Sequence, residues 1–489
     1  MPRVEELIVT SGEAIIEKAF ENVESLRTVS ISKVKVIGAK AFRNCRNLNI
    51  VDYSPEIETI GEGAFENTSI GELKLPYLGS AIDDTTAKLG YYFGGENSSV
   101  PNSLWHVVIG KATLIPNNAF DGCGRLSKID IPSTVTKIGE RAFAGTALSE
   151  YVLDEKVVEI GFGAFAGCES MTSITLPFIG DGRIGEEAKT HFGYVFGADT
   201  YEDHRRTDGT RAVPPSLKNV TILDGRICGN AFFRCDRIET LTFGKDVSEI
   251  SGDAFMFAGN IYSDWYDVGS KFWESYEQVL QSYSVSADNA NFKTIDGVLY
   301  TKDGTTLVSY PTAKSGETFS VPDGVTEIGP YAFYAQRNLK TVNVGNDTQK
   351  LANYAFAGCG VMTMVEFGTK GALKEIGSYA FSKCTGFKAA EFVIAEGVTT
   401  IGVRAFDGTY FDRLVLPSTL ESIKQYALQG AAGRVKFNTT CDWDLRNAGG
   451  YGYADREVTA DTLEDEEEAA RLLCDETHRF YEWIKRKTA

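Results

Sequence analysis

Cysteine and histidine are the residues of this sequence whose side chains could ligate a metal ion or act as nucleophile and base. The chain has nine cysteines and four histidines, His106, His191, His204 and His478. No two cysteines form a CxxC pair, the spacing typical of structural zinc sites. No HExxH or GxSxG motif supports a zinc protease or a serine hydrolase. His191 and His204 share an acidic insertion, for which we favour a solvated loop over a metal site.

Carboxylates could supply a general acid and a general base, and the chain has 67 Asp and Glu residues. Such a pair forms in space and leaves little trace in a sequence, so an enzyme stays the minor alternative. Neither a GxxxxGK[ST] loop nor a strand-linked GxGxxG indicates a bound nucleotide. We therefore expect a non-enzymatic protein that needs no cofactor and no metal ion.

Six of the nine cysteines share one position, because each follows the phenylalanine of an Ala-Phe pair by three residues. In other copies of the pattern the same position holds Thr, Ala, Val or Gln. A position that accepts these residues favours a small, mostly apolar side chain, which a buried free cysteine supplies. We expect core packing there, not disulfides or metal ligation. These six residues are Cys45, Cys123, Cys168, Cys235, Cys359 and Cys384.

The Ala-Phe pairs recur with uninterrupted gaps of 22 to 25 residues, a period typical of leucine-rich repeats. The copy "LSKIDIPSTVTKIGERAFAGT" begins with an alternating strand and continues through a second extended piece. Gly139 is expected to turn the chain, and one helical turn then directs Phe143 into the core. The aligned residues are Phe20, Phe42, Phe65, Phe120, Phe143, Phe165, Phe232, Phe255, Phe333, Phe356, Phe381, Phe406 and, in the thirteenth copy, Leu428.

The recurring "IGxxAFxxC" and "LxxIxIPxxV" patterns resemble the BspA-like leucine-rich-repeat family, also called the type-5 leucine-rich repeat. The resemblance covers roughly residues 4–437. It implies an α/β leucine-rich-repeat solenoid over residues 1–437, right-handed, with a parallel strand-lined face and short helical or turn returns. Known members of the family are similar to surface and adhesion proteins that bind host or matrix proteins.

Three long gaps between the aligned phenylalanines predict insertions near 77–112, 178–225 and 258–320. The first two are copies of one another, as "LPYLG" and "LPFIG" show, so we expect both to leave the solenoid and return in register. The third contains "DGVLYTKDGTTLVSYP", which is typical of a β-hairpin. Its aromatic residues, Trp265 and Trp273 among them, either fasten the insertion to the repeats or form an exposed patch for sugar or protein.

Outward positions of the expected strands align into a mixed, Thr-rich polar strip. One interpretation is a solvated sheet face that is rich in good strand formers. The other is an extended protein-binding surface of the kind that repeat proteins commonly use. The candidate protein-binding residues on this strip are His106, Lys128, Asp130, Thr175, Thr221, Thr242, Asn343 and Glu366.

The tail changes in character, and we expect a linker at 438–456 followed by an amphipathic helix at 457–489. Acidic residues open the helix and basic residues close it, which suits the helix dipole. The helix either caps the last coil or docks a partner through Phe480, Trp483 and Ile484. The apolar stripe is formed by Leu463, Ala470, Leu473, Thr477, Phe480 and Ile484.

Composition narrows the classes of partner and the location. The net charge of −18 argues against binding to nucleic acid or to anionic membrane surfaces. No run of 18 apolar residues predicts a membrane span. The start "MPRVEELIVTSGEAII" is not a secretory signal as written, and the first repeat has no separate cap, so we expect sequence upstream of it.

We therefore expect a protein-binding or adhesion protein at the cell surface or secreted, with a host, matrix or partner protein as its ligand. Recognition would use the repeat face or the insertions. The alternative is an intracellular scaffold or recognition module with a C-terminal docking helix, which the unpaired cysteines and the missing signal favour.

Overall fold

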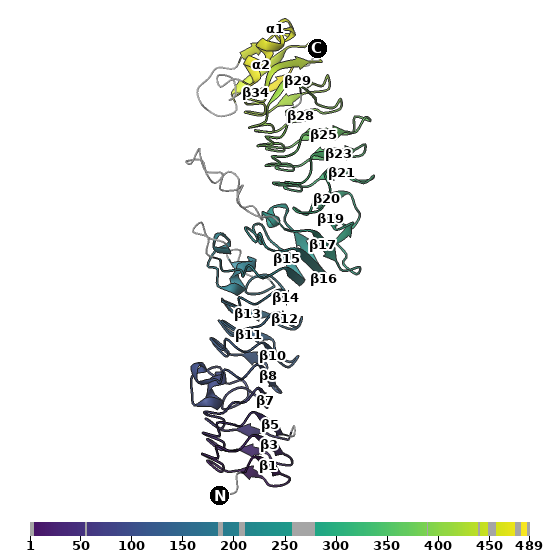
Figure 1. Cartoon of the computed structure of the whole chain (residues 1–489). Coiled ribbons are helices and arrows are strands. Elements are labelled where there is room, and N and C mark those ends of the chain that lie inside the picture. Colours follow the sequence, from purple (N-terminus) through teal and green to yellow (C-terminus); the bar gives the residue numbers. More distant parts are fainter. Residues whose placement is uncertain are drawn as a thin grey trace. The chain divides into compact units, whose positions relative to one another are not determined.

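The computed structural model describes residues 4–53, 56–183, 189–204, 211–256, 279–388, 390–438, 441–447, 456–474 and 481–486. The chain divides into two compact units, Met1–Arg237 (unit 1) and Ile238–Ala489 (unit 2). Both are parallel-strand solenoids, in which most coils contribute a strand to one face and a shorter strand to a second row (Figure 1). The solenoid fold predicted from the repeat is confirmed, with two α-helices near the C-terminus.

In unit 1 the strand face consists of three separate parallel sheets, in the orders β1-β3-β5, β7-β8-β10 and β12-β14-β15. The short second-row strands form the sheets β2-β4-β6 and β9-β11-β13. The face strands are β1 (Glu6–Val9), β3 (Thr28–Ile31), β5 (Ile50–Tyr53), β7 (Glu72–Leu75), β8 (His106–Ile109), β10 (Lys128–Asp130), β12 (Glu150–Val152), β14 (Ser173–Leu176) and β15 (Asn219–Ile227). The second-row strands are β2 (Ala14–Ile15), β4 (Val36–Ile37), β6 (Thr59–Ile60), β9 (Leu114–Ile115), β11 (Lys137–Ile138) and β13 (Glu159–Ile160).

In unit 2 the face strands pair as β16-β17, β21-β23-β25 and β27-β29-β31. The second row forms one sheet in the order β18-β19-β20-β22-β24-β26-β28-β30-β34-β32-β33. The face strands are β16 (Thr240–Ile250), β17 (Ser282–Val285), β21 (Thr318–Ser320), β23 (Thr341–Gly345), β25 (Met364–Phe367), β27 (Glu391–Val393), β29 (Phe411–Leu416) and β31 (Ala432–Phe437). The others are β18 (Phe292–Ile295), β19 (Val298–Thr301), β20 (Thr306–Ser309), β22 (Glu327–Ile328), β24 (Lys350–Leu351), β26 (Glu375–Ile376), β28 (Thr400–Ile401), β30 (Ser422–Ile423), β32 (Trp443–Asn447), β33 (Arg456–Val458) and β34 (Tyr481–Lys485).

The aligned phenylalanines form stacked ladders in the interior. In unit 1 the ring centroids of Phe42 and Phe65 lie 5.9 Å apart, and those of Phe143 and Phe165 lie 5.1 Å apart. In unit 2 the Phe356 and Phe381 rings lie 5.2 Å apart. Burying each such ring stabilises the fold by about 2–3 kcal/mol, so the ladders replace a wide globular core.

The first two insertions do not leave the stack entirely, which corrects the sequence prediction. Each contributes a short 3₁₀ segment, η1 (Leu89–Phe93) and η4 (Phe192–Phe196). The Phe65 N–H donates to the carbonyl of Tyr92, as the Phe42 N–H does to that of Ala64 in an ordinary coil. The residue after Tyr92, Phe93, therefore occupies the ladder position and is fully buried. The hairpin predicted in the third insertion is confirmed, because β19 and β20 pair antiparallel.

Hydrogen bonding explains why Cys and Thr recur three residues after the ladder Phe more fully than side-chain size does. The Cys45 thiol donates to the carbonyl of Phe20 at 3.1 Å, and the Thr68 hydroxyl donates to that of Phe65 at 2.8 Å. The position therefore favours a small side chain that can donate to a ladder carbonyl. All nine cysteines are free, and burial raises the pKa of the Cys45 thiol to about 11 and that of Cys123 to about 12. Thiols with such pKa values are unreactive at neutral pH.

The glycine that follows the short strand permits close coil stacking and does not turn the chain as predicted. Gly139 lacks a positive φ, and its N–H donates to the carbonyl of Ile115 at 2.7 Å. A Cβ atom at Gly139 would lie 2.5 Å from the backbone nitrogen of Asn117, a separation that real Cβ atoms do not show. The left-handed residues lie on either side of the ladder Phe instead, as Arg141 (φ 52°) and Gly145 (φ 65°) do around Phe143.

The C-terminal segment caps the last coil with helices and a strand. Helices α1 (Ala460–Glu464) and α2 (Glu466–Cys474) confirm part of the predicted helix, and α2 packs against β31. The prediction is wrong beyond them, because Tyr481–Lys485 forms β34 between β30 and β32. Trp443–Asn447 likewise forms β32 within the predicted linker. No helix in the described ranges is long and apolar enough to cross a lipid bilayer.

Candidate protein-binding face

The strand face of unit 1 carries two grooves. Each groove lies at a break in the face, where two neighbouring strands belong to different sheets. The sheet β1-β3-β5 ends beside β7, and the sheet β7-β8-β10 ends beside β12. We call the first the Trp105 groove. It measures about 440 Å³ and is lined by Asn49, Ile50, Val51, Asp52, Gly71, Glu72, Lys74 and Trp105. We call the second the Val152 groove. It measures about 380 Å³ and is lined by Ser127, Lys128, Ile129, Asp130, Ile131, Leu148, Glu150, Tyr151 and Val152.

Trp105 is held in place by the coils on both sides of it. Its backbone N–H donates to the carbonyl of Gly71 at 3.0 Å, and its backbone carbonyl accepts from the backbone N–H groups of Ser127 and Lys128. The indole lies over Gly71, because a Cβ atom there would come within 3.5 Å of the indole nitrogen. With 48% of its surface exposed, Trp105 presents a fixed aromatic wall beside Ile50.

An exposed apolar side chain lies beside each break between sheets, Ile50 on β5 at the first break and Val152 on β12 at the second. Val152 is 70% exposed and Ile50 is 56% exposed, and both point outward from strands. At equivalent positions of this face Ser30 and Thr175 are polar, whereas Ile8 is apolar and 63% exposed and Val108 is apolar and half-buried. Exposed apolar groups beside charged ones are typical of protein-binding surfaces.

His106 lies between the two grooves and contacts one carboxylate of each, Glu72 and Asp130. Its Nε2 lies 2.8 Å from an oxygen of Asp130, and its Nδ1 lies 3.6 Å from an oxygen of Glu72. Lys128 Nζ lies 3.4 Å from the same Asp130 carboxylate. Partial burial alone raises the pKa of Asp130, but the hydrogen bond from His106 and the charge of Lys128 outweigh it and lower that pKa. Asp130 is therefore a carboxylate at neutral pH.

The structure brings three of the sequence-predicted residues together and leaves the others apart. His106, Lys128 and Asp130 form the cluster described above, although His106 is only 6% exposed. Thr175 and Thr221 lie opposite one another on β14 and β15 and line neither groove, although Thr175 is the neighbour of Val152 in register. The remaining candidates lie on unit 2 strands or outside the described residues. Thr242 lies on β16, Asn343 pairs in register with Glu366 between β23 and β25, and Trp265 and Trp273 fall outside the described ranges.

Sequence reasoning missed the residues that line the breaks. The copies that contain Ile50, Asp52, Glu150 and Val152 were left out of the predicted strip, although they follow the same register. Trp105 was missed because it lies one residue before its strand. Aligning each copy one residue further upstream places Trp105 beside Gly71, and that pairing is the signal that would have found it.

His191 and His204 are buried, so the prediction of a solvated loop is wrong for both. The Gly193 N–H donates to Nε2 of His204 at 3.0 Å, and Nδ1 of His204 lies 2.7 Å from the Phe233 carbonyl. Burial and the neighbouring His191 lower the pKa of His204 to about 3, which keeps it neutral. Among the described residues no group of three or more His, Cys, Asp or Glu could hold a metal ion.

The first insertion shows that this histidine has a structural role. There Asn97 takes the place of His204, since its side-chain oxygen accepts from the Gly90 N–H at 3.0 Å. Its amide group donates to the carbonyls of Asn118 and Asp121 in the next coil. Both side chains therefore tie an insertion to the coil that follows it.

Comparison with known proteins supports the repeat assignment. A family model described as "BspA type Leucine rich repeat region" matches in six copies, over residues 7–86, 102–188, 215–264 and 310–433. No curated protein matches the sequence significantly.

Among solved structures, a leucine rich cell surface protein from Faecalibacterium prausnitzii A2-165 is 18% identical, with 89% of this chain and 88% of that chain covered and a TM-score of 0.30. The pneumococcal vaccine antigen PcpA is 17% identical, with 75% and 83% covered and a TM-score of 0.38. A leucine-rich repeat protein from Bacteroides ovatus ATCC 8483 is 19% identical, with 87% and 84% covered and a TM-score of 0.34.

Proposed function

Because the chain belongs to the BspA-type leucine-rich repeat family, we propose that it is a non-enzymatic protein that binds a partner protein, at the cell surface, through its repeat face. Solenoid repeats commonly present an extended surface for protein partners. One observation supports the proposal most directly, namely the pair of grooves on the unit 1 strand face, where exposed Trp105 and Val152 lie beside charged residues.

The core does not require this combination of residues. Trp105 and Val152 direct a large part of their surface to solvent, although water contact with apolar surface is unfavourable by about 25 cal/mol per Å². Aromatic and apolar groups in partly enclosed positions are the usual anchors of protein interfaces. Coverage by a partner would remove this surface from water.

The alternative, an intracellular scaffold with a C-terminal docking helix, receives less support. Of its expected anchors, Trp483 is 2% exposed within β34, and Phe480 falls outside the described residues. The apolar side of α2 is occupied as well, because Leu472 and Leu473 are buried in the core that includes β31. The buried cysteines do not separate the two locations, since a thiol such as that of Cys45, whose pKa burial raises, is unreactive in either.

The proposal is tested by measuring capture of purified host and matrix proteins on the immobilised protein. The Trp105→Ala/Val152→Asp variant is expected to lose capture at least tenfold, because both grooves lose their anchors. Thr221→Ala, on the same face but away from the grooves, is the matched control and should capture normally. Equal capture by wild type and the double variant would remove this face from the account. Antibody labelling of intact cells tests the surface location.

A further inference from the structure

The two grooves share one charge pattern, which indicates the chemistry of the partner. The Trp105 groove contains Asp52, Glu72 and Lys74, and the Val152 groove contains Asp130, Glu150 and Lys128. Each groove thus holds two carboxylates and one lysine and has a net negative charge. The chain as a whole carries −18, which adds a long-range attraction for a basic partner.

Within each groove one carboxylate is engaged and one is available. Glu72 and Asp130 lie at the two sides of His106, and Asp130 also pairs with Lys128. In the described part of the chain, neither Asp52 nor Glu150 has an ion-pair partner within 4 Å. A cation that entered either groove would therefore gain a charge-assisted contact without breaking an existing pair.

The apolar walls favour a particular kind of cation. The exposed indole of Trp105 can receive a guanidinium on its face, and Trp is the strongest partner for such cation–π contacts. Val152 is aliphatic and suits the methylene stem of an Arg or Lys whose charged end reaches Glu150. Arginine satisfies both walls, because its planar group stacks on aromatic rings and binds carboxylates in a bidentate manner.

The strand order fixes the distance between the grooves. Strands β7, β8 and β10 lie between the two breaks, and neighbouring strands are about 4.8 Å apart, so the grooves are about 14 Å apart. An extended chain rises about 3.3 Å per residue and covers that distance in about four residues.

Building on the proposed function, we propose that the two grooves together bind one extended basic segment of the partner protein, with arginines about four residues apart entering the Trp105 and Val152 grooves. His106 positions Glu72 and Asp130 at the facing sides of the two grooves and does not itself contact the segment, because it is buried.

The test is a titration of the intact protein with labelled ten-residue peptides, followed by fluorescence anisotropy. One peptide carries two arginines four residues apart, a second carries them two residues apart, and a third has glutamine at both positions. The first is expected to bind at least tenfold more tightly than the other two, and binding should weaken as salt rises. Equal binding of the arginine and glutamine peptides would overturn the proposal and would point instead to an uncharged ligand such as a glycan.

Isosteric variants separate charge from folding. Asp52→Asn/Glu150→Gln should weaken binding of the first peptide about tenfold and leave the melting temperature unchanged, because both carboxylates lie in the open grooves. Trp105→Ala should weaken it about fivefold. Thr221→Ala is the control and should bind as wild type does. If a partner protein is captured through this face while the peptide proposal fails, the proposed function stands and only the basic character of the partner is wrong.

Discussion

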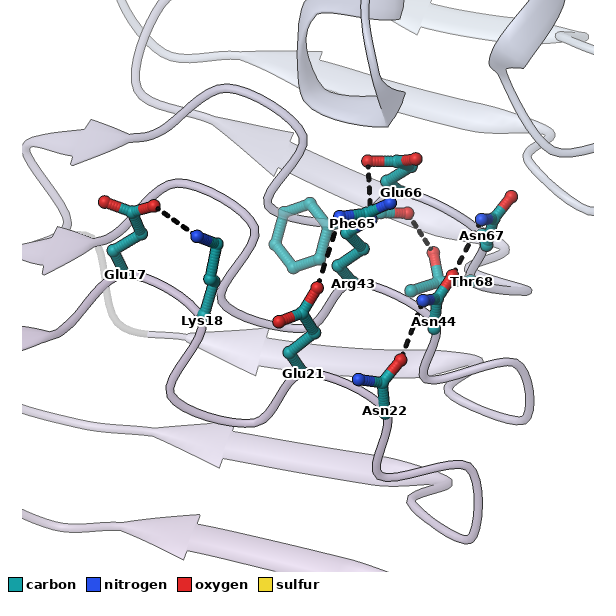
Figure 2. Close-up of polar contacts among 10 residues, drawn as sticks. All are labelled: Glu17, Lys18, Glu21, Asn22, Arg43, Asn44, Phe65, Glu66, Asn67 and Thr68. Carbon is teal, nitrogen blue, oxygen red and sulfur yellow. Dashed lines mark hydrogen bonds and ion pairs between the residues drawn. The ribbon is translucent and has the colours of Figure 1, made fainter.

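The turn side of the repeat is built differently in the two units, although the backbone is the same. Apart from the coil of Phe255, the aligned coils have a left-handed residue two positions before and two positions after the ladder residue. In the first three coils of unit 1 the residue two positions after the Phe is Asn22, Asn44 and Asn67, with φ between 55° and 66°. The Asn44 amide donates to Asn22 and the Asn67 amide donates to Asn44, both at 2.8 Å (Figure 2). Asn tolerates this conformation well.

In unit 2 the residue two positions before the Phe is Tyr331, Tyr354 and Tyr379 in consecutive coils, with φ between 57° and 60°. A bulky residue is strained in this region. The three rings stack at centroid separations of 4.7 Å. The same row in unit 1 holds Lys18 and Lys40, and Lys18 pairs only with its neighbour Glu17 at 3.2 Å in the described part (Figure 2).

The coil requires the left-handed conformation in both units. The two units differ in the side-chain contacts that offset its conformational cost. Side-chain amides offset the cost in the first coils of unit 1, and ring stacking offsets it in unit 2. The core beneath is common to both, so variants of the core should affect the units alike, and variants of the turn rows should not.

The largest effect is expected from the ladder itself. Phe42→Ala in unit 1 and Phe356→Ala in unit 2 should each destabilise the protein by about 3–5 kcal/mol, because each removes a fully buried ring from a stack. Calorimetry should show a lowered transition for each. A large loss in one unit and none in the other would contradict a common core.

The next largest effect concerns the contact between coils. Gly139→Ala should destabilise the protein by about 1–3 kcal/mol, because the new methyl group meets the backbone of Asn117 and Pro116 and the coils must separate. Gly122→Ala is a comparison without a clash, since its Cβ would meet nothing within 4 Å, although its φ of 79° adds strain of about 1 kcal/mol. An unchanged melting temperature for Gly139→Ala would show that the coils are not closely packed.

The tyrosine row gives the sharpest test of the comparison. Tyr354→Ala loses the stack and keeps the strain, so we expect a loss of about 1–2 kcal/mol. Tyr354→Gly also loses the stack but relieves the strain, so it should be about 1 kcal/mol more stable than the Ala variant. Lys40→Gly in unit 1 has no stack to lose and should stabilise. Denaturant unfolding of the three variants measures these changes in the free energy of unfolding, and an Ala variant as stable as the Gly variant would refute the strain.

The smallest effect is the pH dependence of the Asp130 pair. Because the folded-state pKa of Asp130 is lowered, its carboxylate stabilises the fold above about pH 4, the ordinary Asp pKa, and this contribution disappears as pH falls through the folded pKa. The stability difference between wild type and Asp130→Asn should therefore shrink between pH 6 and pH 3. The Tyr354→Ala loss should stay constant over that range. A difference that grew on acidification would contradict the assignment.

The sequence predicts the repeat well because each requirement is local. Ladder residues such as Phe143 recur at a fixed spacing, and a residue such as Thr146 that is usually small follows each of them by three positions. The grooves are not local, because Trp105 meets Gly71 across a 34-residue separation that includes an insertion. The prediction of a helix in the tail is wrong at its end for a related reason. The segment "YEWIK" fits a short strand as well as a helical stripe, and its pairing with the distant strand β30 and with β32 makes it a strand.

We propose that the unit 1 strand face binds the partner, while the tyrosine row of unit 2 stabilises the fold. The most direct measurement is a set of binding isotherms for the peptide with two arginines four residues apart, using wild type, Trp105→Ala and Tyr354→Phe. We predict that Trp105→Ala weakens binding about fivefold and that Tyr354→Phe, which retains the stacked ring, changes nothing. Binding that survives Trp105→Ala unchanged, or that falls with Tyr354→Phe, would contradict the account.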